Sequence, residues 1–247
     1  ANVLDRAWVE EALNFPGPSQ LIQDLAPGVN PVNTYRVCKA FARAFAKESR
    51  VELEAALATC DAEAAGLAYD VDGPQVSRRA LRGYAIRMLG SIGGDDVSSS
   101  ISSAYSSAKN MTDTVSALTG LCGHDDSSAA KKNAFDDFLN KWKDDNNVSC
   151  TWLRMVASDA GKGGDDAIDE MKQLMASDVY DAKNPNKFYS LIGGFAGGNV
   201  EGFHAADGSG YEFVADVLLQ TDAINPQASS RMASPFTKWR LYDEKRQ

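Results

Sequence analysis

The chain contains only two histidines, His124 and His204. Peptidases that hold zinc on a helix use an H-E-x-x-H segment, in which two histidines one turn apart bind the metal and the glutamate acts as a base. Neither histidine lies in such a segment. A lone histidine is more often structural than catalytic, so we expect an exposed His124 in a polar turn and a structural His204. An organised nucleophile is also absent, since the sequence has neither G-x-S-x-G nor a cysteine with a convincing histidine partner.

Two glycine-rich segments could suggest ligand loops. The segment 191–199 lacks the Lys-Ser/Thr pair of a P-loop and a preceding strand, so its small residues predict close helix packing, with Gly197 and Gly198 ending the helix. The segment 207–210 resembles part of a calcium loop but lacks the remaining oxygen ligands. It predicts a tight turn into a helix over 211–219.

The most unusual polar residues lie near the C-terminus. Asn225 is suited to an N-cap and Pro226 to the first helical position. Gln227 and Arg231 would then lie one turn apart on one face of this helix. Such a pair can bind a carboxylate or a peptide carbonyl, although a solvated surface pair is the simpler interpretation of the residues alone.

The elements that must position these residues are helices. Apolar residues recur at helical spacing in 37–45, where Val37, Phe41, Ala44 and Phe45 form one stripe, and in 77–89, where the arginines are expected on other faces. Period-2 runs of β-branched residues are nearly absent. Short Gly-, Pro- and Asp-rich turns predict antiparallel neighbours. Capping residues predict helix starts at Asn110, Ser149 and Gly164-Asp165. We therefore predict an all-α fold, an irregular superhelix of antiparallel helix hairpins like armadillo or HEAT arrays, as a single domain over 1–247.

Composition narrows the function classes. The 247 residues carry a formal net charge of −9, so a nucleic-acid partner is not expected. No uncharged apolar run is long enough for a transmembrane helix. The four cysteines are widely spaced, which favours reduced thiols over a disulfide or zinc framework and fits an intracellular compartment, either cytoplasmic or an organellar lumen or stroma.

A series of short segments points to one family. In the C-terminal part these segments are Asn184–Lys187, Ser190–Gly193, Phe203–His204, Asp207–Tyr211, Asn225–Gln227 with Arg231, Tyr242–Asp243 and Lys245–Gln247. Further segments are Arg78–Arg82, Asn110–Asp113 and Lys141–Trp142 beside Trp152. Together they resemble the C-terminal helical domain of aminopeptidase N, in the bacterial-type branch of the gluzincin zinc metallo-aminopeptidases. The resemblance extends over essentially the whole chain and is most specific in 184–247.

The resemblance implies a helical domain that closes over a separate, upstream catalytic domain and walls the cavity through which peptides enter. It places the zinc site and the exopeptidase motif on that other domain, so we expect no catalytic residue, metal or cofactor in this chain. The resemblance also implies that Gln227 and Arg231 face the substrate cavity and bind substrate. Tyr189 departs from the pattern, because relatives often carry a basic residue at that position.

Two functions follow as expectations. In the first, the chain is a non-catalytic domain of a zinc aminopeptidase, with the catalytic domain as its partner and peptide as an indirect ligand. In the second, it is an aminopeptidase-derived scaffold or linker subunit in a larger complex, as Tyr189 and the missing catalytic half suggest. An independent enzyme is disfavoured because no acid, base and nucleophile come together. A domain built to dock should expose an apolar face when isolated, so we expect the isolated chain to oligomerise or to need a partner.

Overall fold

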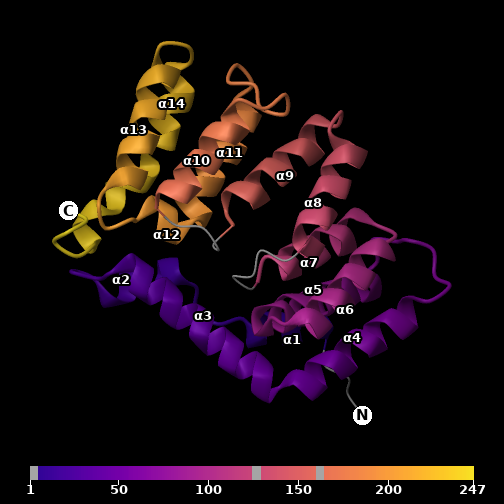
Figure 1. The fold of residues 1–247 in the computed structure, drawn as a ribbon. Coiled ribbons are helices and arrows are strands. Elements are labelled where there is room, and N and C mark those ends of the chain that lie inside the picture. The colour runs from indigo at the N-terminus through magenta and orange to yellow at the C-terminus, as the bar shows by residue number, and fades with distance from the viewer. Residues whose placement is uncertain (1–4, 124–128, 160–163) are drawn as a thin grey trace. The chain divides into compact units, whose positions relative to one another are not determined.

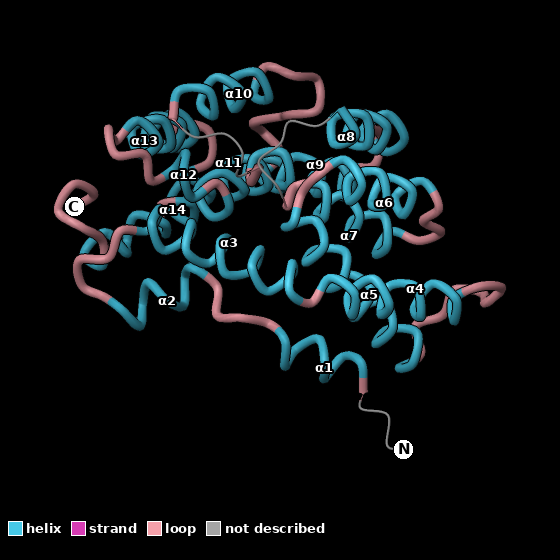
Figure 2. The backbone as a smooth tube through the Cα atoms, turned by 60° about the horizontal axis from the view of Figure 1, so that its bottom comes forward, coloured by secondary structure: helices cyan, strands magenta, loops and turns pink. Residues whose placement is uncertain are grey.

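The computed structural model describes residues 5–123, 129–159 and 164–247. Every regular element in these ranges is a helix, as Figure 2 shows, and the only β feature among them is an isolated bridge between Val29 and Tyr242. The predicted all-α class is therefore confirmed. In the described residues no helix is long and apolar enough to cross a membrane.

The chain divides into two compact units that are interlaced in sequence, residues 1–16 with 38–135 and residues 17–37 with 136–247. The chain passes from one unit to the other three times, between Pro16 and Gly17, within α3 (Pro31–Glu48) and within α8 (Ala129–Trp142). The single domain over residues 1–247 therefore stays a prediction.

The first unit is built around α5, the longest helix. Its helices, besides parts of α3 and α8, are α1 (Arg6–Leu13), α4 (Arg50–Ala64), α5 (Gly73–Ile92), α6 (Asp95–Ser106) and α7 (Met111–Leu121). Helix α5 packs against α1, α4 and α7, while α6 packs against α7. The core between α5 and α7 includes Ala85, Ile86, Ala117 and Leu118, none of which retains exposed surface. Consecutive helices thus pair, as the short turns predict.

The crossing of α5 and α7 depends on glycine. A Cβ atom on Gly90 would lie 2.1 Å from the carbonyl oxygen of Gly120, and one on Gly120 would lie 2.6 Å from the side chain of Ile86. Both distances are below any real van der Waals contact, so the two backbones approach each other in a way that only glycine allows.

The second unit contains the C-terminal helices. Besides parts of α3 and α8 these are α2 (Pro18–Leu25), α9 (Asn146–Ala157), α10 (Asp165–Met175), α11 (Pro185–Gly198), α12 (Val200–Phe203), α13 (Ser209–Asp222), α14 (Pro226–Met232) and a 3₁₀-helix (Ser234–Leu241). Helix α11 packs on α9, and α13 lies beside α14 (Figure 1). Leu153, Leu191, Phe195 and Val214 are fully buried at these contacts.

The glycine-rich segment 191–199 behaves as its residues predict. Helix α11 ends at Gly198, and added Cβ atoms on Gly194 and Gly198 would lie 2.8 Å from the Arg154 carbonyl oxygen and 2.3 Å from the Ser158 hydroxyl. The small residues therefore let α11 approach α9 closely, and the segment is a packing surface.

Several predicted helix starts are confirmed and one is wrong. The side chain of Asn110 caps α7 by accepting a hydrogen bond from the Asp113 amide at 2.9 Å, and α10 begins at Asp165 after Gly164. A helix start at Ser149 was expected, but α9 begins at Asn146, because Asp145 accepts from the amides of Asn147 and Val148 at 2.9 and 3.0 Å. Capping by an aspartate supersedes the weaker serine signal.

Two expectations about helix faces need correction. Arg78, Arg79 and Arg82 were expected on the outer faces of their helix, yet each is less than a tenth exposed, because α4 and the turn before α7 cover that side of α5. In α3 the predicted stripe exists, but Val37 and Phe41 are 65% and 56% exposed. No disulfide joins any of the four cysteines, all of which lie within the described residues, as expected.

Candidate functional site

Gln227 and Arg231 are positioned by a capped helix that is fixed to its neighbour. The side-chain oxygen of Asn225 accepts a hydrogen bond from the Ala228 amide at 3.0 Å, so the predicted N-cap is confirmed. On the inner face of α14, the Ser229 hydroxyl donates to the Leu218 carbonyl of α13 at 2.8 Å. Because Ala228 and Ser229 are buried, the opposite face of α14 is turned outward.

Gln227 and Arg231 both lie on this outward face and are exposed. The guanidinium carbon of Arg231 lies 5.8 Å from the centre of the Tyr189 ring on α11, within the range of a cation–π interaction. Next to it, Met232 covers Gly193. The structure thus brings together Gln227, Arg231 and Tyr189, the residue that departs from the family pattern, as one polar and aromatic surface of the second unit.

This surface offers the hydrogen-bonding groups that a peptide needs. The Gln227 amide can donate and accept, and the Arg231 guanidinium can bind a carboxylate or a carbonyl with two parallel N–H groups. In the described part of the chain neither side chain is engaged in a hydrogen bond or an ion pair. Substrate binding by this pair stays a prediction.

His204 is held in a buried aromatic cluster. Its Nδ1 atom lies 2.7 Å from the Tyr211 hydroxyl, and its ring packs edge-to-face on Tyr242 at 4.8 Å between centres. Burial, together with the nearby positive charge of Arg246, lowers the pKa of His204 to about 4. The imidazole is therefore neutral near pH 7 and helps to fill the core, which is the structural role that the sequence predicts.

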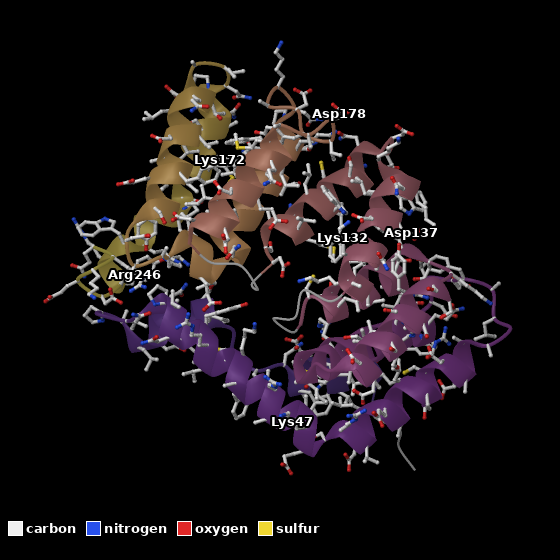
Figure 3. The ribbon with its side chains drawn as sticks, viewed as in Figure 1. Lys47, Lys132, Asp137, Lys172, Asp178 and Arg246 are labelled. Atoms are coloured by element: carbon white, nitrogen blue, oxygen red, sulfur yellow. The ribbon has the colours of Figure 1, made fainter. Side chains whose placement is uncertain are left out.

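The C-terminal segment closes over this cluster. Arg246, labelled in Figure 3, donates from Nε to the His204 carbonyl at 2.8 Å and from Nη1 to the Asp243 carboxylate at 2.7 Å. Its side chain is 6% exposed, so it is a buried cation whose donors are used within the protein. The residues around His204 consequently stabilise the unit rather than leave an imidazole free for chemistry.

The residues present do not fit a zinc ion. Among the residues that the structure describes, no three His, Cys, Asp or Glu side chains gather as a metal site requires. His204 is bonded to Tyr211, while His124 lies outside the described residues. At the calcium-like segment, the Asp207 carboxylate accepts from the Ser209 amide and hydroxyl at 3.0 and 2.7 Å, and Gly208 has a φ of 83°. The predicted tight turn into α13 is confirmed.

One polar cluster was not foreseen from the sequence. Arg82 is buried on α5, where its Nε lies 2.6 Å from Asp61 of α4 and its Nη1 lies 3.3 Å from Asp113 of α7. Beside it, Arg78 and Arg79 line the same cavity of about 290 Å³ within the first unit. The only signal in the sequence was the run Arg78-Arg79-Ala80-Leu81-Arg82, whose spacing does not distinguish a buried cluster from a solvated face.

Comparisons with known proteins agree on one relationship. A family described as "Domain of unknown function (DUF3458_C) ARM repeats" matches residues 1–247. The chain is 30% identical to aminopeptidase N of Escherichia coli over 99% of its own length and 27% of that protein. It is 30% identical to aminopeptidase N of Haemophilus influenzae over 72% of this chain and 20% of the relative.

A solved structure shows the same relationship in three dimensions. The crystal structure of Legionella pneumophila aminopeptidase A in complex with aspartic acid matches the whole chain with a TM-score of 0.82 and 26% identity, over 29% of that protein. The chain thus spans about a quarter of the length of the relatives it matches. It belongs to the DUF3458_C family of ARM-repeat domains, the C-terminal helical domain of aminopeptidase N-like proteins.

Proposed function

We propose that this chain is the non-catalytic helical domain of a zinc aminopeptidase, that it caps a separate catalytic domain, and that it lines the path by which peptides reach the active site. The observation that carries the proposal is the match of the whole chain to about a quarter of aminopeptidase N. The H-E-x-x-H segment occurs nowhere in the 247 residues, which supports a zinc site outside this chain, on the catalytic domain that the proposal assumes.

Two surface features support docking and substrate contact. Val37 and Phe41 lie one turn apart on α3 and are more than half exposed, which suits a face that another domain covers. The exposed Gln227 and Arg231 have unused hydrogen-bonding groups and lie beside the half-buried Tyr189. An exposed surface of this kind becomes the wall of a cavity only when a second domain covers it, and the catalytic domain would do so here.

We propose an intracellular location for the parent protein, either the cytoplasm or an organellar lumen or stroma, because no disulfide joins any of the four cysteines in the described residues.

The first experiment separates the domain from its proposed catalytic partner. The 247-residue chain is assayed with added zinc on aminoacyl and peptide substrates, alone and after mixing with the remainder of the parent polypeptide. We expect no turnover by the chain alone, and a change in peptide turnover on mixing. Appreciable zinc-dependent turnover by the chain alone would refute the proposal. Recovery of the chain in a complex without any peptidase subunit would favour the scaffold function.

The second experiment tests the peptide-facing pair in the parent polypeptide. Removing Gln227 or Arg231 by alanine substitution should raise KM for peptides by roughly tenfold, the loss of one charge-assisted hydrogen bond, while kcat for an aminoacyl amide stays unchanged. Gln220→Ala on α13 and Arg43→Ala on α3 serve as controls, because both side chains are exposed elsewhere. Equal KM values for all four variants would show that the pair is only a solvated surface pair.

A further inference from the structure

The cavity that is lined by Arg78, Arg79 and Arg82 lies entirely within the first unit. It lies between α4, α5 and the turn that leads into α7, and it measures about 290 Å³. Four cationic side chains line it, Arg78, Arg79, Arg82 and Lys109, against two carboxylates, those of Asp61 and Asp113. The lining therefore has a formal charge of +2, in a chain whose net charge is −9.

Arg82 and Arg79 already have partners, but of different kinds. Arg82 is bonded to the two carboxylates, at 2.6 and 3.3 Å. Arg79 donates to the Asp70 carbonyl at 2.8 Å, and its guanidinium carbon lies 4.8 Å from the centre of the Tyr69 ring. These neutral partners orient Arg79 without neutralising its charge.

Arg78 is the exceptional residue. It is 8% exposed and lines the cavity, yet no hydrogen bond or ion pair engages its guanidinium in the described part of the chain. The hydrogen bond from Arg6 is the largest cause of the lowered pKa of Glu63, and the charge of Arg78 adds to this lowering at longer range. The guanidinium therefore opens into the cavity with no carboxylate bonded to it, and its donors are available to an anion that enters there.

Lys109, in the turn before α7, is the fourth cationic side chain that lines the cavity. It is exposed, and no carboxylate within the described ranges pairs with it. At the start of α7, the Asp113 amide already donates to the Asn110 side chain at 2.9 Å, so this amide is not available to a ligand. Side-chain donors from Arg78, Arg79 and Lys109 are what the cavity offers.

We propose that this cavity binds a phosphate group, either as free phosphate or as a phosphate monoester. A monoester carries about −1.5 to −2 charge at pH 7, which matches the formal charge of the lining, and its oxygens accept the paired N–H groups of a guanidinium. A single carboxylate would balance only half of that charge, and a dicarboxylate such as succinate carries its two charges on separate groups rather than at one centre. Arg78 is the main ligand, Lys109 is the second cation, and Arg79 is held in place by Asp70 and Tyr69.

The test measures binding to the 247-residue chain, so its result does not depend on the peptidase proposal. Isothermal titration at constant ionic strength uses inorganic phosphate and O-phosphoserine as probes, with succinate and chloride as competing anions. We expect saturable binding of a phosphate probe and little binding of succinate. Tighter binding of O-phosphoserine than of inorganic phosphate would identify a monoester as the ligand, and the reverse order would identify free phosphate.

Variants decide whether this cavity is responsible. Arg78→Gln should weaken phosphate binding by at least about tenfold and Lys109→Gln by a smaller factor, since each removes a charge-assisted donor. Arg43→Gln makes the same charge change on an exposed site and should leave binding unchanged. Because Lys109 is exposed, its variant should fold even if Arg78→Gln does not.

Several results would overturn the proposal: no saturable phosphate binding, equal binding of succinate, an equal loss with Arg43→Gln, or full binding by a folded Arg78→Gln or Lys109→Gln variant.

Discussion

Gly90 is the position at which one methyl group should matter most to the first unit. In Gly90→Ala the new Cβ would lie 2.1 Å from the Gly120 carbonyl oxygen, more than 1 Å closer than the roughly 3.3–3.6 Å of a close C···O contact. The obstacle is backbone, so no side-chain rotation relieves it. The two helices must separate, and the packing around Ile86 and Leu118 must loosen.

The expected magnitude follows from two opposing terms. Overpacking of a core costs about 1–3 kcal/mol, and a backbone obstacle places this variant at the upper end of that range. Replacing a helical glycine by alanine by itself raises the free energy of unfolding by about 0.5–1 kcal/mol. We therefore expect the free energy of unfolding to fall by about 2 kcal/mol, or a loss of roughly 4–8 °C in Tm for a chain of this size.

Gly197→Ala provides the matched control for this experiment. Gly197 is also helical, but an added Cβ meets no atom within 4 Å, so its stability should stay unchanged or rise by up to about 0.5 kcal/mol. Thermal unfolding of both variants, followed by far-UV circular dichroism, measures the difference. A Gly90→Ala variant as stable as Gly197→Ala would show that the α5–α7 crossing is looser than the structure has it.

Two further predictions concern the second unit. Arg246→Met should lower the free energy of unfolding by about 3 kcal/mol, because it leaves the Asp243 carboxylate and the His204 carbonyl without their donor. Urea denaturation measures this loss, with Lys238→Met at an exposed site as the control. Equal denaturation midpoints for the two variants would contradict the prediction. The pKa of His204 is lowered from 6.5 to about 4 by burial, so the unfolded chain takes up the proton first as the pH falls. Stability should therefore be fully present above pH 6.5 and should decrease by about 3 kcal/mol as the pH falls from 6.5 to about 4. A pH series of denaturant melts measures it, and His204→Gln should flatten the curve between pH 6.5 and 5; an unchanged slope in that variant would assign the effect to other groups.

Interactions between residues that are close in sequence determine the helix caps, the turns and the fold class of this protein. Caps at Asn110 and Asn225, the glycine end of α11 and the turn at Asp207 all depend on bonds between residues a few positions apart, so the sequence predicts them. The same holds for the class of the fold, because helical periodicity is a property of neighbouring residues. The shared face of Gln227 and Arg231 on α14 is of this kind as well, because it follows from their spacing of one helical turn.

Only the tertiary structure decided which helix faces are covered. The arginines of α5 are buried although their spacing suits a solvated face, since α4 and the turn before α7 cover them and Asp61 and Asp113 balance Arg82. Val37 and Phe41 of α3 are exposed although their stripe suits a core. Periodicity shows which residues share a face, whereas burial depends on contacts between residues far apart in the chain, and no local pattern encodes those contacts.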